Sequence, residues 1–330
     1  MYKSFILAPM AELSHRALRE LIEDFGGCDE YFTEMISAPA LLAGGPFEKW
    51  YIDGGPRPEK LVYQLVGADI GQITGAAALL DRLECRGIDL NMGCCAPLIR
   101  KTGAGIIWMA SVDRAGELVK SVRGVVKRRL SVKMRTGLTD SFEYLVKFCR
   151  RLEEEGVELI ILHPRTAKEK LKRRARWDYV GALRQELRIP VAGNGDIADA
   201  GGLLARAAGP CDAVMTGRAA VRRPWIFAEA RAEKAFVPHI EETGLRFLEL
   251  LARWQPPEFH ISRARRFFAL FCDNLKWGNY VKNLLNREET LSGMERAWQG
   301  YFRENPHLSP SSSTPPPAGG APAAHIPGAL

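Results

Sequence analysis

The sequence lacks long apolar runs. In 330 residues, 46% hydrophobic and 26% charged, no run approaches the roughly 18 apolar residues that a membrane span requires. The N-terminal segment MYKSFILAPMAEL has a short apolar core that ends at Pro9, whereas a secretory signal needs a longer core and a small-residue cleavage site. These absences predict a cytoplasmic protein with no membrane association, and we expect it to be a monomer.

Cysteines are few and scattered. There are seven, an odd number, and none lie in a C-x-x-C pattern. Neither a zinc site nor a disulfide framework is therefore indicated, and we expect reduced thiols and no metal.

Positive charge exceeds negative charge, with a formal net charge of +7. Residues 168–176 (KEKLKRRAR) hold six basic residues and one acid, and smaller basic clusters lie at residues 127–129, 222–223 and 263–266. Any one cluster is as readily a solvated face as a binding site. Several clusters on one chain favour a polyanion such as nucleic acid as partner.

Eight short apolar runs recur through the first two-thirds of the chain, each followed by a helical pattern. They span residues 5–10, 31–35, 61–67, 87–93, 131–137, 159–165, 190–197 and 212–218. Apolar runs without strict alternation are typical of parallel strands buried on both faces. Eight such units predict a (β/α)₈ barrel over residues 1–235, and their even spacing disfavours the alternative, an open doubly wound sheet.

Polar residues precede three of the predicted helices. Ser14 and Ser111 are expected to be N-caps, and Thr139 or Asp140 is expected to cap a helix that Gly156 ends.

After the barrel the character of the chain changes. Residues 240–304 have no strand-like runs, and helical patterns span residues 244–254, 262–285 and 289–302. They predict a small all-helical domain in which basic and aromatic residues interleave. Residues 305–330 are rich in Pro, Ala and Ser and hold no Asp, Glu, Lys or Arg, so a disordered tail is predicted.

Polar residues stand at nearly every predicted strand end, where barrels of this kind place their chemistry. One of them alone would be a satisfied or solvated residue, but the whole series predicts an active site near Asn91 and Cys94. The series also includes Glu34, Gln64, Lys133, Arg135, His163, Arg165, Asn194, Asp196 and Arg218.

Glycines follow the last two strands, in Gly193-Asn194-Gly195 and Gly217-Arg218. Backbone amides at this position of a barrel commonly bind a phosphate, so a phosphorylated cofactor is implied.

Together these segments resemble the tRNA-dihydrouridine synthases, flavin enzymes that reduce selected uridines in transfer RNA. The resemblance rests on LAPMAELSHRALREL, NMGC with a downstream KTGAG, VKMRTG, HPRT, GNGDI and MTGRAAVRRPWIF, which occur in that order. It covers residues 5–230 and continues more weakly into the helical region.

The resemblance implies FMN as cofactor, NADPH as reductant and tRNA as substrate. Pro9 and Met10 would back the flavin, and Gln64 and Lys133 would face its pyrimidine edge, where Lys133 would stabilise negative charge on the reduced ring. Other residues are assigned by position. His163 would lie near the ring, Asn194, Gly195, Asp196, Gly217 and Arg218 near the ribityl chain and phosphate, and Asn91, Arg135, Lys168, Lys172, Arg173 and Arg174 against the RNA.

Cys94 is implied as the catalytic acid. Reducing the C5–C6 bond of uracil takes a hydride from flavin N5 to C6 and a proton to C5, and a thiol of ordinary pKa is mostly protonated at neutral pH. The family usually has N-x-G-C-P, whereas Cys95 here takes the place of the proline. The offset from Asn91 still assigns the acid to Cys94.

Two other functions fit part of the pattern. An FMN-dependent barrel that acts on a small molecule, such as a dihydroorotate or dihydropyrimidine dehydrogenase, would share the phosphate loops but needs no basic helical domain. A nucleic-acid-binding protein with an inactive barrel would not need polar residues at the strand ends. The sequence does not indicate which uridine is reduced.

Overall fold

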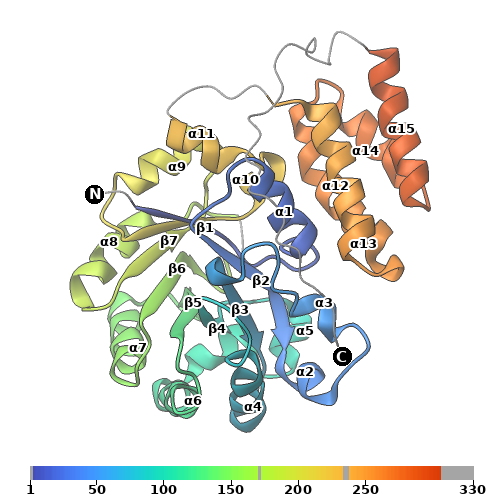
Figure 1. Cartoon of the computed structure of the whole chain (residues 1–330). Helices are drawn as coiled ribbons and strands as arrows, with labels where there is room; N and C mark the ends of the chain where they lie inside the picture. The colour runs from blue at the N-terminus through green and yellow to red at the C-terminus, as the bar shows by residue number, and fades with distance from the viewer. Residues whose placement is uncertain (1–2, 170–171, 233–237, 306–330) are drawn as a thin grey trace.

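A closed barrel of eight parallel strands dominates the computed structural model, which describes residues 3–169, 172–232 and 238–305 (Figure 1). Strands that are neighbours in sequence pair in parallel all the way round, with register shifts in the β2–β3 and β5–β6 pairs, and β8 pairs with β1. The strands are β1 (Ser4–Leu7), β2 (Glu30–Ser37), β3 (Leu61–Val66), β4 (Gly87–Met92), β5 (Arg129–Gly137), β6 (Leu159–Thr166), β7 (Val191–Asn194) and β8 (Ala213–Thr216). The predicted (β/α)₈ barrel is confirmed.

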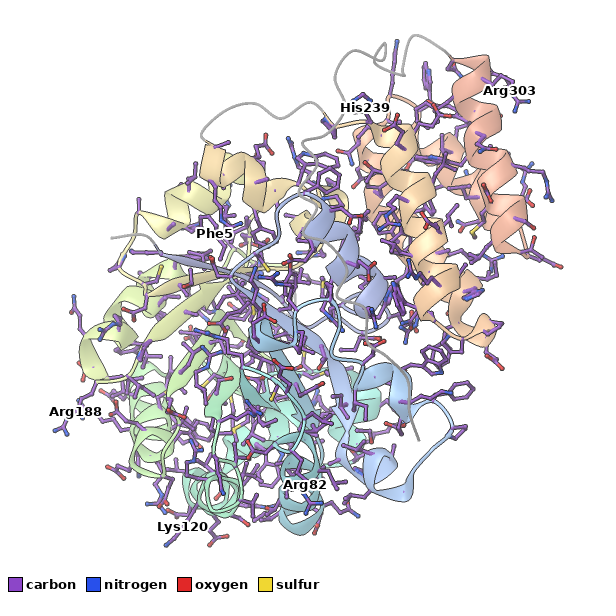
Figure 2. All side chains as sticks on the ribbon, viewed as in Figure 1. Phe5, Arg82, Lys120, Arg188, His239 and Arg303 are labelled. Atoms are coloured by element: carbon purple, nitrogen blue, oxygen red, sulfur yellow. The ribbon has the colours of Figure 1, made fainter. Side chains whose placement is uncertain are left out.

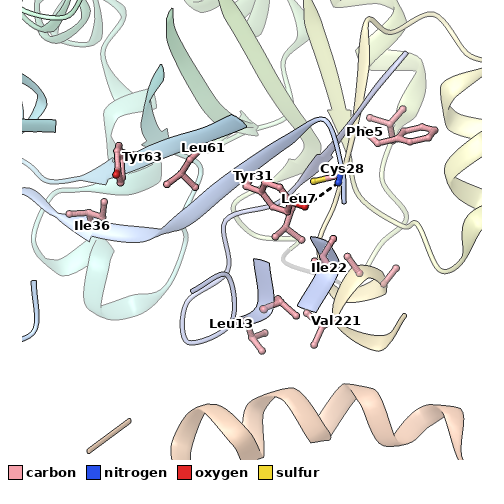
Figure 3. Close-up of a cluster of buried hydrophobic side chains, with 14 of the residues drawn as sticks. Phe5, Leu7, Leu13, Ile22, Cys28, Tyr31, Ile36, Leu61, Tyr63 and Val221 are labelled. Carbon is pink, nitrogen blue, oxygen red and sulfur yellow. Dashed lines mark hydrogen bonds between the residues drawn. The ribbon is translucent and has the colours of Figure 1, made fainter. Parts of the chain in front are cut away.

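The apolar runs form strands because both of their faces are buried. One set of side chains fills the barrel interior at a period of two, for example Ile6 of β1 with Ala8 just beyond it, and Ala213 and Met215 of β8. The alternate set faces the surrounding helices. Figure 3 shows part of this outer layer, where residues from β1, β2 and β3 lie with residues from α1 and α10.

Helices surround the barrel. They are α1 (Arg16–Asp24), α2 (Ala38–Ala43), α3 (Glu48–Tyr51), α4 (Ile70–Leu80), α5 (Pro97–Lys101), α6 (Val112–Arg123), α7 (Phe142–Glu154), α8 (Trp177–Glu186), α9 (Ala200–Ala207), α10 (Arg218–Arg222) and α11 (Ile226–Ala232), with 3₁₀ turns η1 (Pro58–Lys60) and η2 (Gly105–Ala110). Charged side chains such as Lys120 and Arg188 point outward (Figure 2). Among the described residues no helix is long and apolar enough to cross a membrane.

One of the three predicted helix caps is confirmed. The Ser111 hydroxyl accepts the Arg114 amide. The prediction for Ser14 was wrong, because its hydroxyl instead accepts the amide of Met10 and α1 begins one residue later. Ser141, not Thr139 or Asp140, caps α7.

The C-terminal helices form a bundle beside α1 and α10 (Figure 1). They are α12 (Ile240–Trp254), α13 (Pro257–Phe271), α14 (Gly278–Asn286) and α15 (Leu291–Glu304), with a 3₁₀ turn η3 (Cys272–Asn274). Aromatic side chains fill the bundle core, and the rings of Phe247 and Phe267 stack with centroids 3.7 Å apart.

The long helical pattern predicted over residues 262–285 is two helices. The chain turns at η3, and the backbone at Gly278 passes so close to the Cys272 carbonyl that a Cβ would lie 2.2 Å from its oxygen. Only glycine permits this approach, so the helix break is encoded by one residue. The predicted domain boundary near residues 235–240 and the predicted disordered tail fall largely on residues 233–237 and 306–330, which lie outside the described part of the chain.

Ion pairs attach the bundle to the rim of the barrel where the strands end. Arg263 of α13 lies 3.0 Å from Glu34 of β2, and both side chains are almost fully buried. Arg266 pairs with Glu12, which follows β1, at 2.7 Å. The Asn274 side chain donates to the Arg222 carbonyl, beyond β8, at 2.6 Å. The bundle therefore runs along the rim from β8 past β1 to β2.

The burial of Arg263 corrects one prediction. Residues 263–266 were expected to offer their positive charge to a polyanion, but Arg263 is only 2% exposed and its charge is used within the protein. Arg266 remains exposed despite its pairing with Glu12.

Replacing Arg263 should test the importance of this attachment. Burial raises the pKa of Glu34, so its carboxylate depends on the guanidinium beside it. We expect Arg263→Met to lower the free energy of unfolding by about 3–5 kcal/mol, as for other broken buried pairs. In guanidinium denaturation, the double variant Glu34→Gln/Arg263→Met should recover much of the loss. If the double variant instead lost as much free energy of unfolding as the two single variants together, the pairing would be contradicted.

Candidate active site

The strand ends bring the predicted residues together at one end of the barrel, here called the mouth. Asn91 of β4 is in register with Lys133 of β5, and Arg135 of β5 is in register with His163 of β6. Gln64 of β3 is in register with Asp89 of β4. These side chains therefore form one continuous band across four neighbouring strands.

A chain of side-chain hydrogen bonds crosses β5, β4 and β3. The Ser131 hydroxyl donates to Asp89 Oδ1 at 2.7 Å, and Gln64 Nε2 donates to Asp89 Oδ2 at 2.7 Å. Asn91 Nδ2 donates to Gln64 Oε1 at 2.9 Å. Asn91 Oδ1 then accepts the backbone amide of Cys94 at 2.9 Å. The chain links a fully buried carboxylate to the loop that carries Cys94.

The Cys94 loop is held from its other side by the segment KTGAG. The amide of Ile106 donates to the Cys94 carbonyl at 3.0 Å. Gly105 has a φ of +62°, and a Cβ there would lie 2.5 Å from that carbonyl oxygen, so the position requires glycine. Burial raises the pKa of the Cys94 thiol, which therefore keeps its proton at neutral pH. Both Cys94 and Cys95 are partly exposed.

Cations surround the mouth on the side of β5 and β6. Burial lowers the pKa of Lys133 to about 8, which leaves the ammonium mostly charged at neutral pH. Burial, followed by the charges of Lys133 and Arg135, lowers the pKa of His163 to about 2. His163 is therefore neutral and can donate or accept a hydrogen bond but adds no charge.

Arg165 determines which nitrogen of His163 carries the proton. Its Nη1 lies 2.9 Å from His163 Nε2, and a guanidinium only donates, so Nε2 accepts and the proton is on Nδ1. Arg165 also donates to Asp196 Oδ1 and to the Arg173 carbonyl, each at 2.5 Å. The Ala175 amide completes the network by donating to Asp196 Oδ2 at 2.6 Å.

The glycines after β7 and β8 let neighbouring side chains pack closely against the backbone at the mouth. Gly195 has a φ of +120°, and a Cβ there would lie 2.9 Å from the His163 ring. A Cβ at Gly217 would lie 3.0 Å from the Met10 sulfur. Gly217 directly precedes Arg218, whose side chain is exposed. A side chain at Gly195 would fit only if His163 shifted, and one at Gly217 only if Met10 shifted.

The remaining predicted residues divide into two groups. Pro9 is partly buried beside Met10, whereas the Asn194 side chain donates to the Met215 carbonyl at 2.8 Å inside the sheet. Four predicted basic residues of the loop after β6 are exposed: Lys168, Lys172, Arg173 and Arg174. Residues 170–171 of the same basic run lie outside the described residues.

A family model described as dihydrouridine synthase matches residues 6–253 of the chain. The chain belongs to the dihydrouridine synthase family. A probable tRNA-dihydrouridine synthase from Aquifex aeolicus is 32% identical over 256 residues, covering 75% of this chain and 78% of that protein. A tRNA-dihydrouridine(16) synthase from Ralstonia nicotianae is 29% identical over 253 residues, covering 73% of this chain and 76% of that protein.

The fold of the chain is also found in a solved structure of a morphinone reductase variant in complex with tetrahydroNAD. The two share a TM-score of 0.51 and 13% sequence identity, over 73% of this chain and 89% of the reductase. At this identity the likeness shows a common barrel fold.

The sequence predictions missed Asp89 and Ser131. Both are fully buried beneath the mouth. A signal for Asp89 was present, because a carboxylate in the middle of the apolar run GIDLNMG must find hydrogen-bond partners when the strand is buried. Asp196 was assigned to the cofactor, but in the structure its carboxylate already accepts from Arg165 and Ala175. Its contact with a cofactor stays a prediction.

The buried carboxylate should make stability depend on pH. Burial raises the pKa of Asp89 to about 7, above the value of about 3.9 expected in the unfolded chain. Its stabilising contribution is therefore complete below pH 4 and is lost as pH rises to about 7. Asp89→Asn has no such proton to lose, and its amide can still present an oxygen to Gln64.

Relative to the parent protein, Asp89→Asn should therefore gain stability as pH rises from 4 to 7, by about 4 kcal/mol at most. Urea denaturation of both proteins at pH 5 and pH 8 measures the difference. An equal difference at the two pH values would contradict a buried, titrating Asp89.

Proposed function

We propose that the protein reduces the C5–C6 double bond of uridine in tRNA, with FMN as cofactor and NADPH as reductant. Membership of the dihydrouridine synthase family and the names of the similar proteins support the reaction and the substrate. The arrangement of residues at the mouth supports the distribution of roles that follows.

Cys94 is the proposed acid, and the observation that carries the proposal is its partly exposed position at the mouth, where Asn91 accepts its backbone amide. Reduction of uracil needs a proton at C5, and a group that keeps its proton at neutral pH while partly exposed at the mouth meets that need. Burial raises the thiol pKa, and Asn91 and Ile106 hold the loop by its backbone. The remaining N–H of the Asn91 amide is free to bind a uracil carbonyl.

The glycines and the cation at the mouth suit a flavin mononucleotide. Gly195 and Gly217 let His163 and Met10 pack closely against the backbone, and Arg218 offers a guanidinium to the phosphate. Lys133 would hold negative charge at the pyrimidine edge, and the Nδ1–H of neutral His163 would donate to the ring. When bound, FMN would accept a hydride from NADPH and pass it to C6 of the uracil.

A folded RNA is a better fit than a small substrate. The exposed basic loop after β6 and the helical bundle both border the mouth, so a large polyanion can contact both while one base enters. At the start of α14, Trp277 and Tyr280 are 58% and 59% exposed, and the Lys276 ammonium lies 5.4 Å from the Trp277 ring. Exposed aromatic rings beside cations are typical of surfaces that stack RNA bases.

Replacing Cys94 separates the two half-reactions. We expect Cys94→Ala to slow uridine reduction by about 10²–10⁴-fold, because only proton delivery is lost. Reduction of the flavin by NADPH should be unchanged, since it does not use the thiol. Stopped-flow absorbance measures the flavin step and nucleoside mass spectrometry the uridine step.

Cys95→Ala is the matched control, because it removes the neighbouring thiol and should have a much smaller effect. If Cys95→Ala abolished uridine reduction while Cys94→Ala did not, the assignment of the acid would be reversed.

Replacing Arg218 tests the phosphate contact without any turnover. Loss of one charge-assisted hydrogen bond should weaken FMN binding by about 10–100-fold in Arg218→Ala. Quenching of FMN fluorescence during titration of the apoprotein measures the affinity. Arg188→Ala, exposed before β7 at the opposite end of the barrel, is the control. Equal affinity in both variants would exclude Arg218 as a phosphate ligand.

A further inference from the structure

Asp89 lies beneath the mouth, and its side chain has an unusual position in the hydrogen-bond chain. Above pH 7 Asp89 is an ionised carboxylate, which only accepts hydrogen bonds. The amides of Gln64 and Asn91 each have one accepting and one donating end of nearly equal size. An amide of this kind can turn by 180° at little steric cost, so its partners must determine which end faces where.

The direction of the chain follows from its two ends. At the inner end, Asp89 Oδ2 accepts, so Gln64 must turn its Nε2 inward and its Oε1 toward Asn91. Asn91 must then turn its Nδ2 toward Gln64, which leaves its Oδ1 for the Cys94 loop. At the outer end, the amides of Gly93 and Cys94 both require an acceptor, and Asn91 Oδ1 is 3.2 Å and 2.9 Å from them.

We propose that Asp89 is a positioning residue for the reaction: acting through Gln64 and Asn91, its carboxylate orients both amides and holds the backbone of the Cys94 loop. This inference rests on the proposed function for its catalytic consequence. With the chain reversed, Asn91 would turn an N–H toward two other N–H groups, and the loop would lose its acceptor.

A comparison of two replacements at Asp89 provides the first test, made on the full chain with Cys95→Ala so that Cys94 is the only partly exposed cysteine. Asp89→Leu removes the acceptor. We expect kcat for tRNA to fall about 10²-fold, the cost typical of a small displacement of a catalytic group, with little change in KM. Alkylation of Cys94 by iodoacetamide should become faster because the loop is released.

Asp89→Asn can present its oxygen to Gln64 and its amide group to Ser131. Its kcat and its rate of Cys94 alkylation should therefore both stay close to those of the parent. Glu30→Gln is the control for general destabilisation, because Glu30 is a buried carboxylate at the opposite end of the barrel, paired with Arg129. It should change neither readout. If Asp89→Leu left kcat and the alkylation rate as they are in the Cys95→Ala parent, the proposal would be overturned.

A reversal of the chain provides a second test that does not require Asp89→Leu to fold. At pH 8, Asn91→Asp alone places an acceptor against Gln64 Oε1 and should accelerate Cys94 alkylation. In the double variant Asp89→Asn/Asn91→Asp, every bond can form with Gln64 turned round, so alkylation should slow again. In a Gln64→Met background the effects of Asp89→Asn and Asn91→Asp on the alkylation rate should become independent. Gln64→Met removes the amide through which the two positions are coupled.

Coupling that persists with Gln64→Met would arise from direct repulsion between two carboxylates, and additive effects would mean no coupling; either result overturns the proposal. The alkylation measurements need no flavin or RNA. A protein that forms no dihydrouridine would therefore refute the proposed function while these measurements still decide the role of Asp89.

Discussion

Pairing of β8 with β1 is the constraint on which the structure depends. All eight strands are parallel and so end on the same side, and because the sheet closes on itself in sequence order, residues far apart in the chain meet there. Asn91 and Lys133 become neighbours through register alone, as do Arg135 and His163. An open sheet would have separated the glycines after β7 and β8 from Met10, which follows β1.

Buried charge is the cost of this arrangement, and three of the buried charges near the mouth are compensated locally in different ways. Glu34 is paired with Arg263 of the helical bundle, and Arg165 is paired with Asp196. Asp89 is satisfied by neutral donors, Ser131 and Gln64. The Glu34–Arg263 pair attaches the bundle, and Arg165 connects the basic loop to His163. Asp89 orients the amides that hold the Cys94 loop.

The barrel could be predicted from the sequence because parallel strands buried on both faces leave a strong local signal, a short apolar run repeated eight times. Once the strands were assigned, the candidate site residues at their ends could be predicted directly. The break between α13 and α14 was missed because it depends on one close approach at Gly278. Ser14 looked like a cap, but its hydroxyl was used by Met10.

Partners distant in sequence could not be predicted. Arg263 lies in a basic cluster, which predicts an exposed side chain. Its burial depends on Glu34, which precedes it by more than two hundred residues. The roles of Arg165 and Asp196 likewise depend on a contact between two loops. Asp89 could have been predicted, because a carboxylate stands out in an apolar run. It was missed because only residues at the strand ends were considered, and Asp89 lies one layer below them.

The central claim is that this mouth reduces uridine in tRNA, and one measurement tests it most directly. Unmodified tRNA is incubated with the purified protein, FMN and NADPH, and its nucleosides are analysed by mass spectrometry. The account predicts that a uridine gains two hydrogen atoms, with one NADPH consumed for each. Unchanged tRNA nucleosides, together with NADPH oxidation that a small pyrimidine stimulates, would contradict it.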